Sequence, residues 1–255
     1  MRKDLLNLKM DDLVSSHAIE NMYVFLAALF LIAFALIPFL GYADLVDHVI
    51  AAVAIFVAIA SFLHTYQLYG LKSKEGWAWL LLTISVILIL TASLLDAFGH
   101  GFLYFIFRFV SIPIMTLGLI IKLWFTGMDL TLSQKTVSAI TFIGWVLLIF
   151  VSSVLPVMDG DFNYITDAYA FYAIAEIIAL MVSIFIIQTI QAKGWYFISI
   201  GLILISMGDI FHPLAENFGL IYPGSPIRLF WYLGLLVAGF GAFYQRKEHL
   251  KYIAM

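Results

Sequence analysis

The stretch GWAWLLLTISVILILTASLLDAF, residues 76–98, decides the fold. Its side chains are apolar or small and uncharged until Asp96, close to the end of the stretch. About 20 such residues form a helix long enough to cross the hydrocarbon core of a bilayer, which is roughly 30 Å thick. A segment in lipid must also satisfy its own backbone hydrogen bonds, and a helix does so. Residues 76–98 therefore predict a transmembrane helix.

The rest of the chain repeats this pattern. Of its 255 residues, 64% are apolar and 11% are charged, against roughly 45–50% and about 25% in soluble domains. Because the connections between the apolar segments are short, neighbours in sequence should pack as antiparallel neighbours. We therefore predict an all-α polytopic membrane helix bundle. Its eight expected transmembrane helices cover residues 22–40, 47–70, 76–98, 102–126, 135–157, 167–191, 194–213 and 227–245.

Basic residues predict the orientation of this bundle, because cytoplasmic loops are enriched in lysine and arginine. With eight spans, 11 of the 13 basic residues fall on one side, and Arg108 and Arg228 are the exceptions. Both termini are then cytoplasmic, and the protein is a multi-pass protein of the cell membrane. The basic residues on the predicted cytoplasmic side are Arg2, Lys3, Lys9, Lys72, Lys74, Lys122, Lys135, Lys193, Arg246, Lys247 and Lys251.

Three regions are expected along the chain: a cytoplasmic N-terminal segment (1–21), the transmembrane bundle (22–245) and a basic cytoplasmic tail (246–255). Apolar residues occur in the first region at roughly helical spacing. That region is therefore either an interfacial helix on the inner leaflet or a partly ordered tail. The bilayer is the first expected partner, and a net charge of −3 indicates no nucleic-acid partner.

The bundle divides into two halves, 22–126 and 135–245, with similar motifs in the same order. If the likeness reflects a duplication, the halves are parallel four-helix repeats related by an axis along the membrane normal, as in some transporters. The alternative is a chance alignment of two apolar sequences. The first half contains Asp47, Gly76-Trp77, Asp96, His100 and Arg108, and the second contains Asp167, Gly194-Trp195, Asp209, His212 and Arg228.

Ionisable side chains are costly inside a membrane, which makes them candidates for function. Most of those in this chain lie near the outer ends of the predicted helices. Asp96 and His100 are one helical turn apart and so share a face. The functional interpretation is an outward-facing site for a proton, an ion or a small molecule. The expected ligand-binding residues are Asp96, His100, Arg108, Asp209, His212, Glu216 and Arg228.

The same residues allow a structural interpretation. Asp96 would pair with Arg108, and Asp209 with Arg228, as ion pairs between neighbouring helices, while the remaining acidic side chains would be hydrated. A metal site is a further alternative, because mixed nitrogen and oxygen ligands suit zinc or a similar cation. No spacing matches a metal motif such as HExxH. The metal-ligand candidates are Asp44, Asp47 and His48.

Two ionisable residues are expected deeper in the membrane. Glu176 lies far from both predicted interfaces, and His64 occupies a comparable helix of the other half. Glu176 would either carry a proton in a coupled carrier or be a neutral acid that is hydrogen-bonded to His64, Tyr172 or a serine. His64 is expected nearer the cytoplasmic end, either in proton coupling or as a packing residue.

The sequence predicts no cofactor. Retinal would need a Schiff-base lysine inside the bundle, whereas Lys122 is expected at an inner helix end. A pair of haem ligands would need histidines at one depth, and His64 is expected deeper than the other bundle histidines. The chain contains no cysteine, which excludes thiolate catalysis and Cys-ligated metals. With no nucleophile–base pair or metal motif, the chain is not expected to be an enzyme.

The segment GDIFHPLAENFGLIYPGSPIRLFWYLGLLVAGFGAFYQRKEH, residues 208–249, resembles the end of prokaryotic multi-helix membrane sensor modules. Those modules precede histidine kinase or diguanylate cyclase outputs. Arg228 departs from the pattern, because the family often has an acid there, and no output domain follows. The resemblance implies either a freestanding sensor half or a sensor that works through a partner chain. The shared residues are Gly208-Asp209, Tyr222, Gly224-Ser225, Trp231, Gly234 and Gly241-Ala242.

Three functions remain open on these residues. The first is a sensory or ligand-binding membrane module whose basic tail signals to a cytoplasmic partner. The second is a secondary transporter or ion-conducting protein with Glu176 as the coupling residue. The third is a membrane enzyme that modifies lipid. The glycines Gly234, Gly239 and Gly241 allow close helix approach, either within the chain or in a homodimer.

Overall fold

The computed structural model describes most of the chain, with a gap where the fifth predicted span would lie. That span, 135–157, falls outside the described residues except at isolated positions, so an eighth helix is not confirmed. The described residues are 2–39, 42–126, 131–133, 135, 136, 139, 140, 143, 164–190, 192–217, 219, 220, 222 and 225–253.

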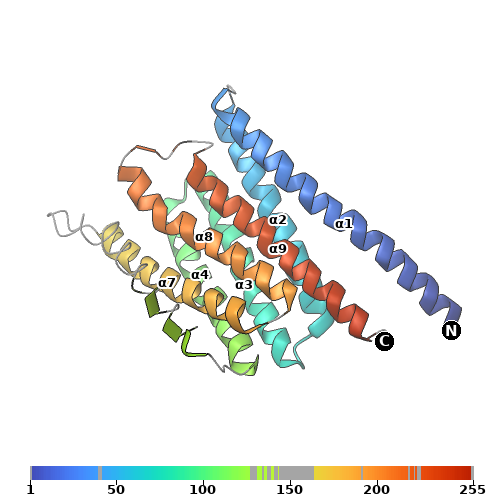
Figure 1. Ribbon diagram of the computed structural model, residues 1–255. Coiled ribbons are helices and arrows are strands. Elements are labelled where there is room, and N and C mark those ends of the chain that lie inside the picture. Colours follow the sequence, from blue (N-terminus) through green and yellow to red (C-terminus); the bar gives the residue numbers. More distant parts are fainter. Residues whose placement is uncertain are drawn as a thin grey trace.

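Every described element is helical, which confirms the all-α fold (Figure 1). Six helices are long and apolar enough to cross a membrane, and a seventh, α7, adds the apolar stretch Glu176–Thr189. The chain is therefore a multi-pass membrane protein. The elements are α1 (Arg2–Leu36), a 3₁₀ turn (Ile37–Phe39), α2 (Ala43–Tyr69), α3 (Lys74–Ala97), α4 (Gly101–Thr126), α7 (Tyr164–Thr189), α8 (Lys193–Asn217) and α9 (Pro226–Ile253).

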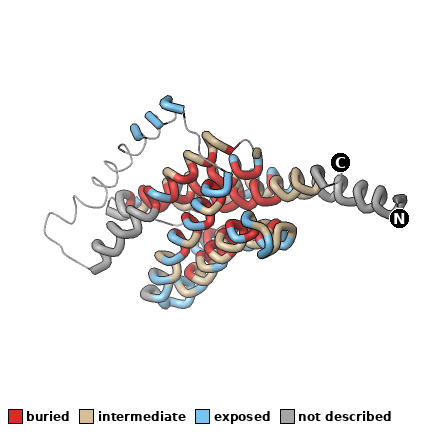
Figure 2. Tube along the Cα trace, turned by 90° about the horizontal axis from the view of Figure 1, so that it is seen from below, coloured by how far each residue is buried: buried red, intermediate tan, exposed pale blue. Residues whose placement is uncertain are grey.

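Six of the helices form a closed ring. Each packs against its neighbour in the order α2, α3, α4, α7, α8 and α9, and α9 returns to pack against α2. Most of the buried residues belong to these six helices, and the tube of Figure 2 shows them gathered in the middle of the bundle. The rings of Trp79 on α3 and Trp195 on α8 lie there, with centroids 4.7 Å apart, and both side chains are fully buried. The sequence comparison had paired Trp195 with Trp77, which instead is half exposed.

The first helix lies outside the ring, against α9 and α2 (Figure 1). It runs without a break across the predicted boundary at residue 21 and has 35 residues, or about 52 Å at 1.5 Å per residue. Its apolar part, His17–Leu36, is the candidate membrane span. Lys247 Nζ on α9 donates to Glu20 Oε1 at 2.6 Å. This ion pair holds the two ends of the chain at the same end of the bundle.

A tight connection between α2 and α3 shows how the sequence ends one helix and starts the next. Gly70 ends α2 with φ at 61°, a backbone conformation that glycine adopts without steric cost. Its N–H donates to the carbonyl oxygen of Tyr66. The Ser73 side chain then accepts a hydrogen bond from the backbone N–H of Gly76 at 2.9 Å and caps the start of α3.

Glycines bring α8 and α9 into close contact. A Cβ atom on Gly234 would lie 2.6 Å from the carbonyl oxygen of Gly201, and one on Gly241 would lie 2.6 Å from that of Gly194. Gly239 faces the other side, where its Cβ would lie 3.1 Å from the Cα of Ala58 on α2. The predicted glycine contacts of the last helix are thus made within the chain.

Candidate functional site

The ring is bridged across its interior by Arg108 on α4 and Asp209 on α8. Nη2 of Arg108 donates to both carboxylate oxygens of Asp209, at 2.7 and 2.9 Å. The two side chains are 15% and 5% exposed. An ion pair withdrawn from water must recover a large desolvation cost, so such pairs are retained where geometry is good. Here one guanidinium nitrogen donates hydrogen bonds to both carboxylate oxygens.

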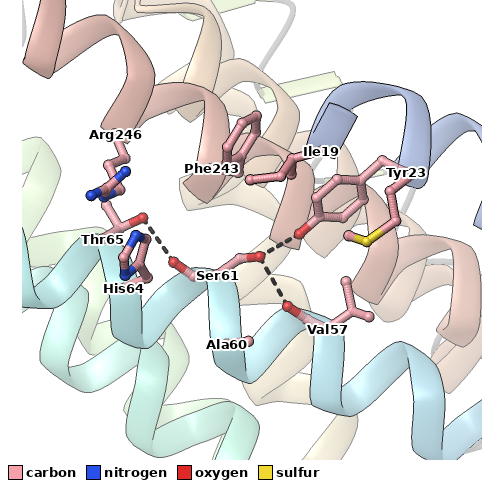
Figure 3. Close-up of a pocket in the computed structure, with 10 residues that line it drawn as sticks. Ile19, Tyr23, Val57, Ala60, Ser61, His64, Thr65, Phe243 and Arg246 are labelled. Carbon is pink, nitrogen blue, oxygen red and sulfur yellow. Dashed lines mark hydrogen bonds between the residues drawn. The ribbon is translucent and has the colours of Figure 1, made fainter. Parts of the chain in front are cut away.

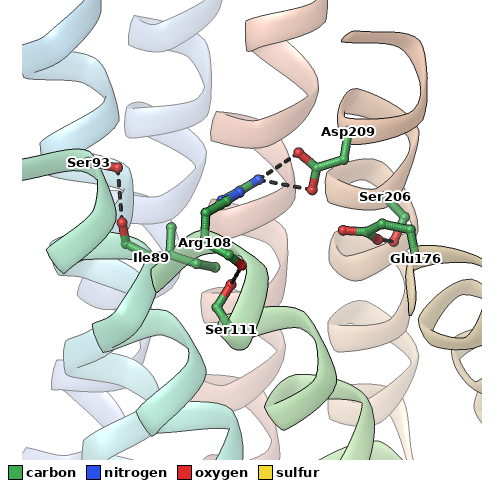
Figure 4. A network of polar contacts seen from close by, with 7 residues as sticks. All are labelled: Ile89, Ser93, Arg108, Ser111, Glu176, Ser206 and Asp209. Atoms are coloured by element: carbon green, nitrogen blue, oxygen red, sulfur yellow. Dashed lines mark hydrogen bonds and ion pairs between the residues drawn. The ribbon is translucent and has the colours of Figure 1, made fainter. Parts of the chain in front are cut away.

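A second carboxyl group joins this ion pair from α7. Glu176 is fully buried, and Ser206, one turn before Asp209 on α8, donates its Oγ to Glu176 Oε2 at 2.5 Å. The carboxyl groups of Glu176 and Asp209 lie close enough to interact directly. Figure 4 shows Arg108, Asp209 and Glu176 converging from three helices. One guanidinium therefore faces two carboxyl groups; we call these three residues the carboxyl-pair site.

A second ion pair lies between α2 and α9. Asp47, 1% exposed, accepts a hydrogen bond from Arg228 Nη1 on its Oδ2 atom. Its other oxygen, Oδ1, accepts from the Tyr232 hydroxyl at 3.0 Å. Arg228 and Tyr232 are four residues apart on α9 and so project from the same face. Here one carboxylate is matched by one guanidinium and one hydroxyl.

Trp231 on α9 packs against Arg108 of the first ion pair. Its ring centre lies 5.8 Å from the guanidinium carbon of Arg108 and 5.2 Å from the ring of His212. Gly208 makes room for it, because a Cβ there would lie 2.5 Å from the indole Nε1. Arg228 lies three residues before Trp231 on α9. The Gly208-Asp209 motif therefore holds both an ion-pair residue and the contact surface for this indole.

The pairing differs from the structural interpretation of the sequence. Arg108 was predicted to pair with Asp96, and Arg228 with Asp209, but Arg108 binds Asp209 and Arg228 binds Asp47. Each arginine therefore reaches a helix that is distant in sequence. The reason is the ring, which turns the polar faces of α4 and α9 inward toward α8 and α2.

Several predicted site residues lie elsewhere. Asp96 and His100 are exposed near the junction of α3 and α4. Asp44 and His48 are exposed on α2, where the His48 ring nitrogen Nδ1 contacts the backbone oxygen of Asp44 at 2.6 Å. Among the described residues, no group of three or more acidic or imidazole side chains could hold a metal ion. The Glu216 side chain lies outside the described residues.

His64 is not part of the carboxyl-pair site. It lines a crevice between α1, α2 and α9, on the outer side of α2 (Figure 3). Glu176 faces Ser206 and Asp209 instead, so the two deep ionisable residues do not meet. Of the hydrogen-bond partners that the sequence offers for Glu176, the structure has a serine, Ser206.

A further charged residue lies at the other end of the ring. Lys122 on α4 forms an ion pair with Glu75 on α3, and its Nζ lies 5.0 Å from the ring centre of Trp195 on α8. The lysine was expected at a helix end and is 9% exposed. The indole of Trp195 lies over the ammonium group of Lys122 and so contributes to the burial of this lysine.

The Arg108–Asp209 and Lys122–Trp195 contacts define one seam between α4 and α8. Fourteen residues separate the two contacts along each helix, or about 21 Å at 1.5 Å per residue. Met115 and Leu202 lie midway on the two helices, and both are buried. The seam therefore has charged groups at both ends and an apolar layer between them.

Two hydroxyl groups are buried along this part of α4 and α8 without a hydrogen-bond partner. They are Oγ1 of Thr116 and Oγ of Ser199. A buried polar atom without a partner is costly and commonly marks a place where water or a ligand binds. Among the described residues, these two hydroxyls are the buried side-chain oxygens without a hydrogen-bond partner between the two ends of the seam.

Sequence reasoning missed four partners of the site residues: Ser206, Trp231, Tyr232 and Glu75. Ser206 had one available signal, because it lies three residues before Asp209 and so shares its helix face. Trp231 appeared only as a shared residue of the resemblance. The roles of Tyr232 and Glu75 depend on which helices are neighbours, and the sequence did not provide that.

Comparison with protein-family models, with curated protein sequences and with solved structures finds no match to this chain. The resemblance of residues 208–249 to membrane sensor modules gains no support from these comparisons. The findings show an all-α, multi-pass membrane protein, and its function has to be argued from the site.

Proposed function

We propose that this chain is an integral membrane sensory module in which the carboxyl-pair site binds and releases a proton. The observation that carries the proposal is the charge balance of the site. Arg108 can neutralise one carboxylate. Its Nη2 donates to both oxygens of Asp209, so Asp209 is the carboxylate that it neutralises. Glu176, fully buried beside Asp209, is the second carboxyl group. Two carboxyl groups that share a site do not both ionise readily, so a proton on one is the simplest compensation.

Proton binding would act on the packing of three helices. Loss of the proton would place a second negative charge beside Asp209, and Arg108 would then be attracted to both carboxylates. Arg108 is on α4 and the carboxyl groups are on α7 and α8, so the change would move helices relative to each other. A buried charge that reorganises its partners is a common physical basis of membrane switches. The basic tail 246–255 would pass the change to a cytoplasmic partner.

The test is a pH titration of tryptophan fluorescence in nanodiscs, from about pH 4 to pH 9, the range where carboxyl and imidazole groups titrate. Trp231 contacts Arg108, so its emission should report the protonation step. Glu176→Gln imitates the protonated acid, and we expect it to keep the low-pH emission throughout. Trp231→Phe should remove most of the signal change.

The control for that titration is His100→Gln, which removes an exposed imidazole outside the site. We expect this variant to titrate like the wild type. A wild type whose emission does not change with pH would overturn the proposal. So would a Glu176→Gln variant that retains the full transition.

A secondary transporter or ion-conducting protein is the second candidate. The α4–α8 seam favours it, because charged groups lie at both of its ends and the hydroxyls of Thr116 and Ser199 lie between them. Proteoliposomes with an internal pH dye test this: a transporter should dissipate a proton gradient, and Glu176→Gln should be at the level of empty liposomes. No flux above empty liposomes would leave the sensory module.

The internal repeat and the membrane orientation are part of the proposal. The triplets α2–α3–α4 and α7–α8–α9 pack in the same internal order, and each touches the other triplet at both ends. Arg108 of the first triplet binds α8, and Arg228 of the second binds α2. This adjacency supports two parallel repeats. The basic residues support a cytoplasmic location for the end that holds both termini.

A further inference from the structure

We propose that the crevice between α1, α2 and α9 binds one anionic phospholipid, with its phosphate at Arg246 and an acyl chain along α1 and α2. The crevice has a volume of about 320 Å³, at the lower end of ligand-binding pockets. Ten residues line it: Ile19, Met22, Tyr23, Val57, Ala60, Ser61, His64, Thr65, Phe243 and Arg246.

The polar and apolar groups of the crevice are sorted by depth. Along α2, His64 and Thr65 lie toward the end of the helix, and Ala60 and Val57 lie one and two turns deeper. Along α9, Arg246 lies toward the helix end, and Phe243 lies one turn deeper. His64 and Arg246 thus lie toward the helix ends, and Val57, Ala60 and Phe243 lie deeper along the helices (Figure 3). A phospholipid has the same order of head group and chain.

The head-group end carries positive charge. Arg246 lines the crevice, and Lys247 follows it on α9, where it pairs with Glu20. An arginine offers five N–H donors, so it can bind phosphate while it keeps other contacts. His64 supplies a further polar group beside it, whereas the Thr65 hydroxyl is buried and donates to the backbone oxygens of Ser61 and Ala242. Basic pockets between transmembrane helices at a membrane surface are suited to anionic head groups.

The chain end is open to lipid because α1 is loosely attached. The first helix lies outside the ring and touches it mainly through α9. A hydrogen bond between the Tyr23 hydroxyl and Ser61 Oγ joins α1 to α2 at the floor of the crevice. Met22 and Ala60 are exposed on either side of that bond. An acyl chain can therefore lie against both helices without separating them.

The test measures lipid binding to the purified full chain in detergent. Phosphatidylglycerol, which is anionic, should raise the midpoint of thermal unfolding in a saturable way, and zwitterionic phosphatidylcholine should not. Arg246→Gln removes the charge at the head group and should weaken the apparent affinity about tenfold, the loss of one charge-assisted contact. Ala60→Phe fills the exposed chain end and should weaken it similarly with Arg246 intact.

Lys193→Gln is the matched control, since it removes one exposed charge from the start of α8 at the same end of the bundle. It should bind phosphatidylglycerol like the wild type. Equal binding of both lipids, or wild-type affinity in Arg246→Gln and Ala60→Phe, would overturn the proposal. Full competition by inorganic phosphate would also overturn it, because the site would then recognise phosphate without a chain.

Discussion

The ammonium group of Lys122 lies 5.0 Å from the ring centre of Trp195, at the opposite end of the α4–α8 seam from the carboxyl-pair site. A cation over an indole ring gains from the ring quadrupole, and the gain increases as water is removed. Trp195 is fully buried, and its ring packs at a tilt of 40° against that of Trp79. The seam is thus closed at this end by an aromatic layer that holds a charge in place.

Replacement of Lys122 by methionine should destabilise the bundle. The change removes the ion pair with Glu75 and the contact with Trp195. Because Glu75 is 30% exposed, water can solvate it after the change, and we expect a loss of about 1–3 kcal/mol rather than the full cost of an isolated buried charge. Chemical unfolding in detergent measures it. Lys193→Met, an exposed lysine, should change stability by less than about 0.5 kcal/mol.

Replacement of Arg108 by glutamine should lower the free energy of unfolding by more than the Lys122 replacement does. Asp209 and Glu176 would then face each other with no guanidinium, in a place where their side chains are 5% and 0% exposed. Removal of one partner from a buried ion pair typically costs about 3–5 kcal/mol. The double variant Arg108→Gln/Asp209→Asn should recover part of that loss, since no unpaired charge remains. A double variant no more stable than Arg108→Gln would show that the pair is not the source of the loss.

The sequence predicted the helices well because hydropathy alone determines which segments can lie in lipid. The predicted spans 76–98 and 102–126 agree within about three residues with α3 and α4, as is usual for helix ends. The contacts of individual side chains were harder to predict than the helices. Hydropathy gives the depth of Arg108 in the membrane, but it does not give the direction of its side chain around the helix axis.

The carboxyl-pair site depends on the direction in which the Arg108 side chain leaves its helix. The ring brings α4 to α7 and α9 to α2, two neighbour relations that short connections do not predict. Arg108 consequently meets Asp209 from a distant helix instead of Asp96 from the preceding one. Lys122 lies near the end of α4, as the sequence predicts, but hydropathy does not predict that the indole of Trp195 from α8 lies over its ammonium group.

The stability that the Asp47–Arg228 ion pair provides should depend more on the charge of Asp47 than on the hydroxyl of Tyr232. Asp47→Asn removes the charge matched by Arg228, which is 26% exposed and can reach water, so we expect a loss of about 2–3 kcal/mol. Tyr232→Phe removes one neutral donor and should cost about 1 kcal/mol. Thermal and chemical unfolding of both variants provide the comparison. A larger loss for Tyr232→Phe than for Asp47→Asn would contradict this ranking.

The contact between α8 and α9 should tolerate no side chain at Gly201. A Cβ atom there would lie 2.5 Å from the backbone nitrogen of Ala238, and backbone cannot move aside as a side-chain end can. We expect Gly201→Ala to destabilise the chain by about 1–3 kcal/mol, the usual cost of overpacking. Gly118→Ala is the control, because its closest contacts would be 3.1 to 3.4 Å, mostly to side chains of α3, and its loss should be smaller. The unfolding midpoints of both variants, measured in the same detergent, test this prediction. Equal stability of Gly201→Ala and Gly118→Ala would show that α8 and α9 are less closely packed than the glycine contacts indicate.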